Sequence, residues 1–256
     1  MSQKVIYEQP LNERIRAFLR LEFLFLQVRH HLGGTSPWDS RATLSNLLDI
    51  MSIFGRSDLK SEVMKELERH TATLARLEKN PDVDRAQLSE LLDEMDLLID
   101  RLHSHNGPVG AHLKSNEFLS AIQQRSAIPG GLCDFDLPAF HFWLERPPAE
   151  RMRDLSEWLD SFDTIGRGIK LIMRLTRGSN LFREHVAEGG FFQRTLDPNI
   201  PCQMVRVALP AGSPYYAEIS GGRHRFSVRF MQQPSTSERA VQASKDVPFE
   251  LACCVI

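Results

Sequence analysis

The sequence predicts an α+β fold, in which a multi-helix N-terminal domain is followed by an antiparallel β-strand domain. From Leu11 to about Arg177, apolar residues recur at three- and four-residue intervals, the spacing of amphipathic helices. After Gly178 they alternate with polar residues, which is typical of half-buried strands. Stretches rich in glycine and proline, such as PAGSP and SGG, separate these alternating runs. We therefore expect an α-helical domain at residues 9–178 and an antiparallel β domain at residues 179–256.

Breaks in the helical spacing divide the first domain into separate helices. Pro10 and Asn12 mark the start of the first helix, because proline and a capping side chain are typical of helix starts. Gly55 ends the second helix, and Asn80 with Pro81 stops the third, which is expected to form a hairpin with the fourth. The expected helices span residues 11–32, 38–54, 57–79, 82–105, 116–125, 137–144, 149–162 and 163–177.

Alternation defines the strands of the second domain. In the stretch MVRVAL, Val205, Val207 and Leu209 share one face, whereas Met204 is out of step with them. Two further segments are expected: a strand at residues 3–8, which is a candidate to join the β domain from the N-terminus, and a polar surface loop at residues 233–246.

Composition excludes several classes of protein. The chain has 42% hydrophobic and 25% charged residues and a net charge of −2, which is typical of a soluble globular protein without the basic excess of a nucleic-acid binder. Its apolar runs are far shorter than the ~20 residues of a membrane span, and its start lacks the apolar core of a signal peptide. We therefore expect a cytoplasmic protein that is not inserted in a membrane.

One stretch, CDFDLPAFH, brings residues with catalytic potential close together. Cys133, Asp134, Asp136 and His141 could supply a nucleophile, carboxylates and an imidazole, but their spacing matches no metal or nucleophile motif. Asp136 precedes a helix that begins with proline, so a capping role without chemistry is the simpler interpretation. The sequence also lacks a phosphate-binding loop and a dinucleotide fingerprint. We expect no enzyme, no cofactor and no metal, with a hydrolase centred on Cys133 as a rival hypothesis.

The stretch GRHRFSVRF, residues 222–230, predicts a strand with one basic face. Side chains two residues apart point the same way, so Arg223, Arg225, Ser227 and Arg229 form the polar face. The apolar face consists of Phe226, Val228 and Phe230. Three like charges so close together repel one another unless an anion is bound, and the forked guanidinium suits a carboxylate or a phosphate. The pattern therefore indicates an anion-binding surface, for which a solvated face and nucleic-acid binding remain alternatives.

Other arginines lie in the helical region. Arg16 and Arg20 are four residues apart and share a face of the first helix, where Glu13 and Glu22 can neutralise part of their charge. Arg56 follows the glycine that ends the second helix, so its side chain could reach outward.

Four long stretches resemble the ZapD family of bacterial Z-ring-associated proteins. They are YEQPLNERIRAFLRLEFLF, IPGGLCDFDLPAFHFWL, SGGRHRFSVRFM and FELACC, and their order holds over nearly the whole chain. The resemblance implies a homodimeric cell-division factor that is recruited to midcell, where it binds the C-terminal tail of the tubulin-like FtsZ and cross-links FtsZ filaments. This tail is a short peptide with carboxylates and hydrophobic anchors.

The resemblance also implies which residues contact the tail. Carried over position by position, it favours Arg56, Arg225 and Arg229, and ranks Arg223 below them. Arg16, Arg20 and His141 also fall in stretches that resemble the family. The stretch VGAHLKSNEF departs from the family pattern, with Glu117 where a basic residue is expected. A nucleic-acid binder that uses the arginine strand is the alternative function.

Overall fold

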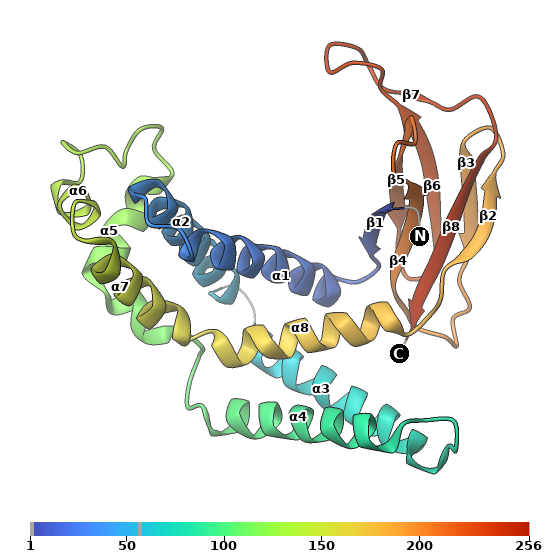
Figure 1. Ribbon diagram of the computed structural model, residues 1–256, viewed down its shortest axis with the longest axis horizontal. Coiled ribbons are helices and arrows are strands. Elements are labelled where there is room, and N and C mark those ends of the chain that lie inside the picture. The colour runs from blue at the N-terminus through green and yellow to red at the C-terminus, as the bar shows by residue number, and fades with distance from the viewer. Residues whose placement is uncertain (1–2, 56–57, 256) are drawn as a thin grey trace. The chain divides into compact units, whose positions relative to one another are not determined.

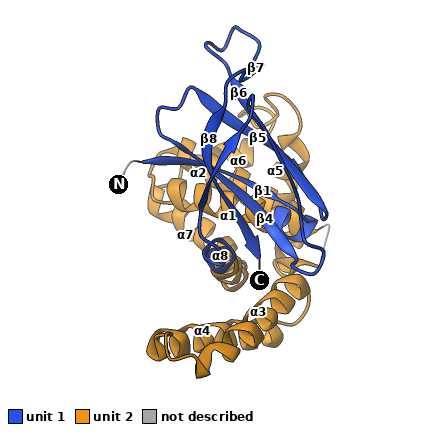
Figure 2. Ribbon diagram, turned by 90° about the vertical axis from the view of Figure 1, so that its right-hand side faces the viewer, with its two compact units in different colours: residues 1–17, 173–256 blue, residues 18–172 orange. Residues whose placement is uncertain are grey.

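The computed structural model describes residues 3–55 and 58–255, and it confirms the predicted α+β class. Helices dominate the first two thirds of the chain, and antiparallel strands follow them (Figure 1). The chain divides into two compact units, Met1–Ala17 with Met173–Ile256 and Phe18–Ile172 (Figure 2). We describe each unit by itself.

The eight α-helices found among the described residues follow the expected order. They are α1 (Glu13–Leu32), α2 (Pro37–Phe54), α3 (Leu59–Ala75), α4 (Arg85–Ser104), α5 (Glu117–Ser126), α6 (Pro138–Leu144), α7 (Pro148–Asp160) and α8 (Asp163–Gly178). The expected hairpin of the third and fourth helices is confirmed, because α3 packs along α4 (Figure 1). The third helix was predicted to run to Lys79, but its last turn, Arg76–Lys79, is a 3₁₀ helix that precedes Pro81.

Capping side chains explain why several helices begin where they do. The Ser36 hydroxyl accepts a hydrogen bond from the backbone of Asp39, whose carboxylate accepts one from the backbone of Ser36, so α2 starts with a capping box. Asp58 and Asp84 accept hydrogen bonds from first-turn N–H groups of α3 and α4. The predicted start of α3 at Ser57 lies outside the described residues.

The strands form two antiparallel sheets. The strands are β1 (Lys4–Pro10), β2 (Arg183–Ala187), β3 (Phe191–Thr195), β4 (Cys202–Pro210), β5 (Tyr215–Gly221), β6 (Arg225–Gln232), β7 (Val241–Gln242) and β8 (Val247–Val255). The first sheet has the order β1-β4-β8-β2, and the second has the order β3-β6-β5, with β7 also paired to β6. Residues 233–246 were expected to form a surface loop, but part of this segment is the short strand β7, which pairs with β6. Ala243, which follows β7, is buried, and its N–H donates to the Phe230 carbonyl at 2.8 Å.

The hydrophobic core of this unit lies between the two sheets. β4 contributes Val205, Val207 and Leu209, as the alternation predicts. β8, the neighbour of β4 in the same sheet, adds Phe249 and Leu251, and β6 of the other sheet contributes Phe226, Val228 and Phe230. Met204 is out of step with Val205, Val207 and Leu209, as expected, and points to the opposite face of β4. It is still fully buried, because β4 is a central strand between β1 and β8 and is covered on both faces.

Ionic contacts attach the N-terminal strand to the sheet. β1 pairs with β4 along its whole length, with Glu8 opposite Arg206. The Glu8 carboxylate accepts hydrogen bonds from the Arg206 Nε at 2.9 Å and from the Arg177 Nε and Nη2, both at 2.9 Å. These side chains are largely buried, so loss of the Glu8 carboxylate would leave two guanidinium groups without their charged acceptor.

Candidate functional site

The alternating side chains of β6 divide the strand into a buried face and a basic face. Phe226, Val228 and Phe230 are at most 1% exposed, because they point into the core between the sheets. Arg225 and Arg229 lie on the opposite face and are exposed to solvent. The predicted alternation of β6 is therefore confirmed by the burial of its side chains.

Arg223 lies at a different place from the one expected. It belongs to the turn between β5, which ends at Gly221, and β6, which begins at Arg225. The Gly222 N–H donates to the Arg225 carbonyl at 3.0 Å and closes this turn. Arg223 therefore does not continue the row on the strand, since the chain reverses direction before the alternation reaches it.

Neighbouring strands complete the basic surface. Arg229 lies opposite Phe191 on β3 and Glu218 on β5. Ser227 is opposite Gln193 and Ser220, and Arg225 is opposite Thr195. Because directly opposed residues point to the same side of a sheet, these side chains share one face. We call the set Phe191, Gln193, Thr195, Glu218, Ser220, Arg225, Ser227 and Arg229 the arginine face.

Charges on the arginine face are not neutralised by the chain itself. Within residues 3–55 and 58–255, Arg223, Arg225 and Arg229 form no ion pair, even though Glu218 is on the same face. The paired arginines of this unit, Arg177 and Arg206, are by contrast largely buried against a carboxylate. Exposed guanidinium groups without a carboxylate keep their donors available for an external anion.

Two hollows meet at the turn residue Arg223. The first, of about 510 Å³, is lined by the arginines of the β6 region together with Phe191 and Gln193 of β3. The second, of about 390 Å³, is lined by Arg223 and by apolar side chains that include Leu11 and Ile200. Arg223 lines both hollows. One ligand could therefore place an acidic region in the first hollow and an apolar region in the second.

Charges near β3 also affect neighbouring titratable groups. The pKa of His185 on β2 is lowered by burial and by the nearby guanidinium groups of Arg194 and Arg183. The pKa of the Cys253 thiol is lowered to about 6 by a hydrogen bond with Cys202 and by Arg194, against the opposing effect of burial. Burial is the main cause for His185 and the hydrogen bond with Cys202 is the main cause for Cys253, and the guanidinium of Arg194 adds to both shifts.

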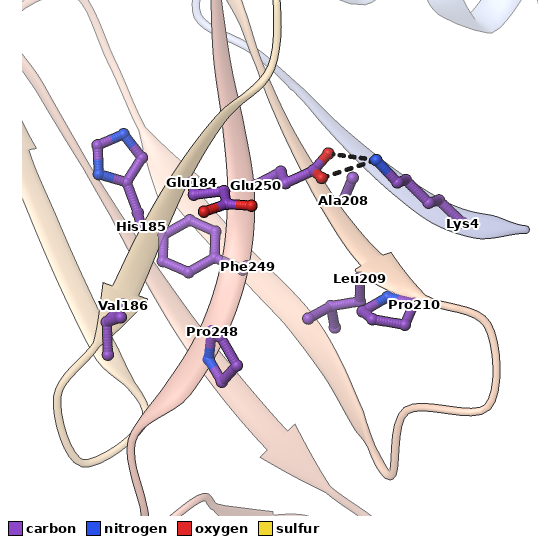
Figure 3. Close-up of a pocket in the computed structure, with 10 residues that line it drawn as sticks. All are labelled: Lys4, Glu184, His185, Val186, Ala208, Leu209, Pro210, Pro248, Phe249 and Glu250. Carbon is purple, nitrogen blue, oxygen red and sulfur yellow. Dashed lines mark hydrogen bonds and ion pairs between the residues drawn. The ribbon is translucent and has the colours of Figure 1, made fainter. Parts of the chain in front are cut away.

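A further hollow lies at one end of the other sheet. It has a volume of about 440 Å³ and a mainly apolar lining that includes Val186, Pro210 and Pro248. The ammonium group of Lys4 on β1, which lines this hollow, already forms an ion pair with Glu250 on β8 at 2.7 Å (Figure 3). None of the residues predicted from the sequence as site residues lines it.

The other predicted site residues that the structure describes are not on the strands that form the arginine face. Arg16 is half-buried on α1, where its Nε donates to Glu13 at 3.1 Å. Arg20 and His141 are exposed, and both belong to the unit Phe18–Ile172. Arg56 lies outside the described residues. Within the unit that contains the strands, the structure brings together Arg223, Arg225 and Arg229.

Sequence reasoning missed the residues that flank the arginines. Phe191 and Gln193 come from β3 and Glu218 from β5, and neither strand was singled out from the sequence. The Gly189-Gly190 pair between the stretches REHVA and FFQRT was a signal for the β2–β3 turn. The register that places these residues beside Arg229 has no comparable local signal.

The stretch CDFDLPAFH does not form a catalytic arrangement. Asp136 accepts a hydrogen bond from the Arg125 Nη1 at 2.6 Å and lies 3.4 Å from the Cys133 sulfur. His141 is exposed and hydrogen-bonds to neither of them within the described chain. The predicted capping role of Asp136 is wrong, because the residue before α6 is Leu137 and Asp136 is held by Arg125 instead.

Two classes of site are absent from the part of the chain that the structure describes. It holds no group of three or more histidine, cysteine or acidic side chains arranged to bind a metal ion. No helix among the described residues is long and apolar enough to span a membrane.

Comparisons with known proteins agree on one family. A family model described as ZapD, cell division protein, matches residues 19–229. A cell division protein ZapD from Methylococcus capsulatus is 46% identical over 256 residues, which covers 100% of both chains. Proteins of the same name from Aromatoleum aromaticum and Coxiella burnetii are 39% and 35% identical, and the alignments cover at least 98% of each chain.

Proposed function

Because this chain belongs to the ZapD family of cell division proteins, we propose that it binds the C-terminal tail of FtsZ on its arginine face and cross-links FtsZ filaments. Cell division is the function that the family carries. FtsZ as the partner follows from the resemblance of the sequence stretches to this family. The chemistry of the arginine face supports the position of the tail on that surface.

The observation that carries the proposal is the pair of exposed arginines, Arg225 and Arg229, that have no carboxylate partner in the described chain. Their planar, forked donors match the carboxylates of an acidic peptide. Arg223 extends the basic surface to a second, partly apolar hollow, where hydrophobic side chains of the tail would find contacts. Electrostatic attraction of this kind favours fast association and specificity.

Cross-linking of filaments needs two tail-binding sites in one protein assembly, and a homodimer would supply them. Each protomer would hold one tail, so that one dimer connects two filaments at midcell. A single contact of this kind can be weak, because many tails along each filament raise the effective concentration of binding partners. Arg16, Arg20, Arg56 and His141 remain proposed contributors to tail binding.

Nucleic acid is a less suitable ligand for the arginine face. Proteins that bind single strands stack bases on exposed aromatic rings beside basic residues. Here Phe226 and Phe230, which alternate with the arginines along β6, are buried in the core. The rings that share this face among the described residues, Phe191 and the half-buried Tyr216, come from the neighbouring strands β3 and β5. The chain also has a net charge of −2. These features favour an acidic peptide over a phosphate backbone.

Binding of a fluorescent peptide with the sequence of the FtsZ tail tests this function. We expect saturable binding that weakens as salt is raised, since exposed charges are screened beyond ~8 Å at physiological ionic strength. A parallel titration with DNA and RNA of the same length is the control. Tight binding of nucleic acid at moderate salt, without binding of the tail peptide, would overturn the proposal.

A further inference from the structure

The strand β3 is an open edge of the sheet that carries the arginine face. In the order β3-β6-β5, β3 pairs with β6 on one side, and no other strand within residues 3–55 and 58–255 pairs with its other side. The opposite edge, β5, packs beside β1. Four of the five residues of β3 are exposed to solvent. An open edge presents unpaired N–H and C=O groups, which another extended chain can pair with.

Two backbone hydrogen bonds fix which backbone groups of β3 face outward. The Phe230 N–H donates to the Gly190 carbonyl at 2.9 Å, and the Leu196 N–H donates to the His224 carbonyl at 2.8 Å. Because backbone direction alternates along a strand, the groups of residues 192 and 194 also face β6. The N–H and C=O groups of Gln193 and Thr195 therefore point away from β6, toward the open edge.

The arginine face continues across this edge. Gln193 and Thr195 lie on that face, between the open edge and the β6 residues Ser227 and Arg225. A strand added beside β3 would lie two strand spacings, or roughly 10 Å, from β6. Long acidic side chains on it and the arginines of β6 can bridge this distance by reaching toward each other across Gln193.

The other face of an added strand meets a different surface. Phe192 points to the inner side of β3, where its ring lies 5.3 Å from His185 and 5.2 Å from Phe249. Side chains of an added strand alternate between the two faces. Carboxylates on one face and apolar side chains on the other would therefore meet the arginines and this aromatic cluster, respectively.

We propose that the FtsZ tail binds as an additional β-strand along the edge of β3, with its carboxylates on the arginine face. This inference rests on the proposed function, and it adds the conformation of the tail and the backbone groups that hold it. Main-chain hydrogen bonds to Gln193 and Thr195 supply affinity, and alternate side chains supply specificity. Arg225 and Arg229 then act as the residues that select an acidic sequence.

A scan of N-methylated tail peptides tests strand addition without changing the protein. Each peptide carries one methyl group on one backbone nitrogen, which removes one donor. In an added strand only every second N–H faces β3, so binding should weaken at least about tenfold at alternate positions and stay nearly unchanged between them. Equal loss at neighbouring positions, or no loss at any position, would overturn strand addition.

A matched pair of variants tests the same edge from the side of the protein. Gln193→Pro removes an N–H that faces outward, so the pairing of β3 with β6 is kept, as for prolines in natural edge strands. Gln193→Ala removes the side chain and keeps the N–H. We expect at least about tenfold weaker tail binding for the proline variant and a small change for the alanine variant. Equal effects of the two variants would contradict the proposal.

The two experiments separate failure of this inference from failure of the proposed function. If the unmodified peptide does not bind the wild-type protein, the proposed function fails. If it binds, and the methylation scan lacks a two-residue period, only strand addition fails. The peptide scan remains decisive even if Gln193→Pro disturbs the fold, which circular dichroism would detect.

Discussion

Arg229 on β6 and Glu218 on β5 lie directly opposite each other, yet no ion pair joins these two exposed side chains. Opposed charges on neighbouring strands attract by only about 0.2–1 kcal/mol when they are exposed. Glu218 is thus a weak internal competitor for the guanidinium that we assign to the tail. Its carboxylate also repels an acidic peptide that approaches the arginine face.

Removing this competitor should strengthen tail binding. We expect Glu218→Gln to bind the FtsZ tail peptide about two- to fivefold more tightly at low salt, with a smaller gain at high salt because the charge is exposed. Fluorescence anisotropy at several salt concentrations measures the effect. Glu184→Gln, which removes an exposed carboxylate on β2, is the matched control. Unchanged or weaker binding by Glu218→Gln would show that the tail does not approach Arg229.

Reversing the charge of the strand arginines should abolish tail binding. Arg225→Glu and Arg229→Glu each replace a guanidinium by a group that repels the acidic tail, so we expect at least about tenfold weaker peptide binding. The circular dichroism spectrum should not change, since both side chains are exposed. Arg239→Glu, an exposed arginine of the segment 233–246, makes the same charge change away from the strand. Equal losses in all three variants would indicate a general effect of net charge.

The ionic contacts of Glu8 should contribute to the stability of the β unit. Glu8→Gln removes the charge that faces both Arg177 and Arg206, and the Arg206 side chain is only 14% exposed. We expect the free energy of unfolding to fall by about 2 kcal/mol, because a largely buried guanidinium loses its charged acceptor. Urea denaturation followed by circular dichroism measures the change. A loss no larger than that of Glu184→Gln would contradict this role.

Buried His70 should make the protein less stable in mild acid. Burial and the charge of Arg69 lower the pKa of His70 to about 4, from 6.5. The unfolded chain therefore binds a proton at higher pH than the folded chain, so stability is full above pH 6.5 and falls progressively as the pH drops toward 4. The total loss should be about 3 kcal/mol. His70→Leu should flatten the dependence between pH 7 and 5.5 in urea titrations, and an unchanged slope would contradict this assignment.

The sequence predicted the elements of the fold better than their arrangement. Helical spacing and alternation depend on neighbouring residues, so the order of the helices in the described chain and the two faces of β6 were correctly predicted, whereas the end of the third helix was not. Arg223 was misplaced because the alternation continues through a turn that the strand does not include. The pairings of Arg229 with Phe191 and Glu218 depend on the register between strands, and many registers fit the same pattern.

The candidate site likewise has features that could be predicted from the sequence and features that could not. The basic residues of β6 could be found from their spacing, and the anion was suggested by their like charge. The open edge of β3 could not be found, because an edge is a property of strand order within the sheet. The contact between Arg125 and Asp136 was also missed, since a capping role was the simpler local interpretation of Asp136.

Co-sedimentation with FtsZ filaments tests the central proposal most directly. The wild-type protein would be pelleted with full-length FtsZ and with FtsZ that lacks its C-terminal tail, under the same nucleotide and salt conditions. We predict that the protein enters the pellet with full-length filaments and stays in the supernatant with the truncated ones. Equal pelleting with both forms would contradict tail binding, since the filaments would then be held through another surface.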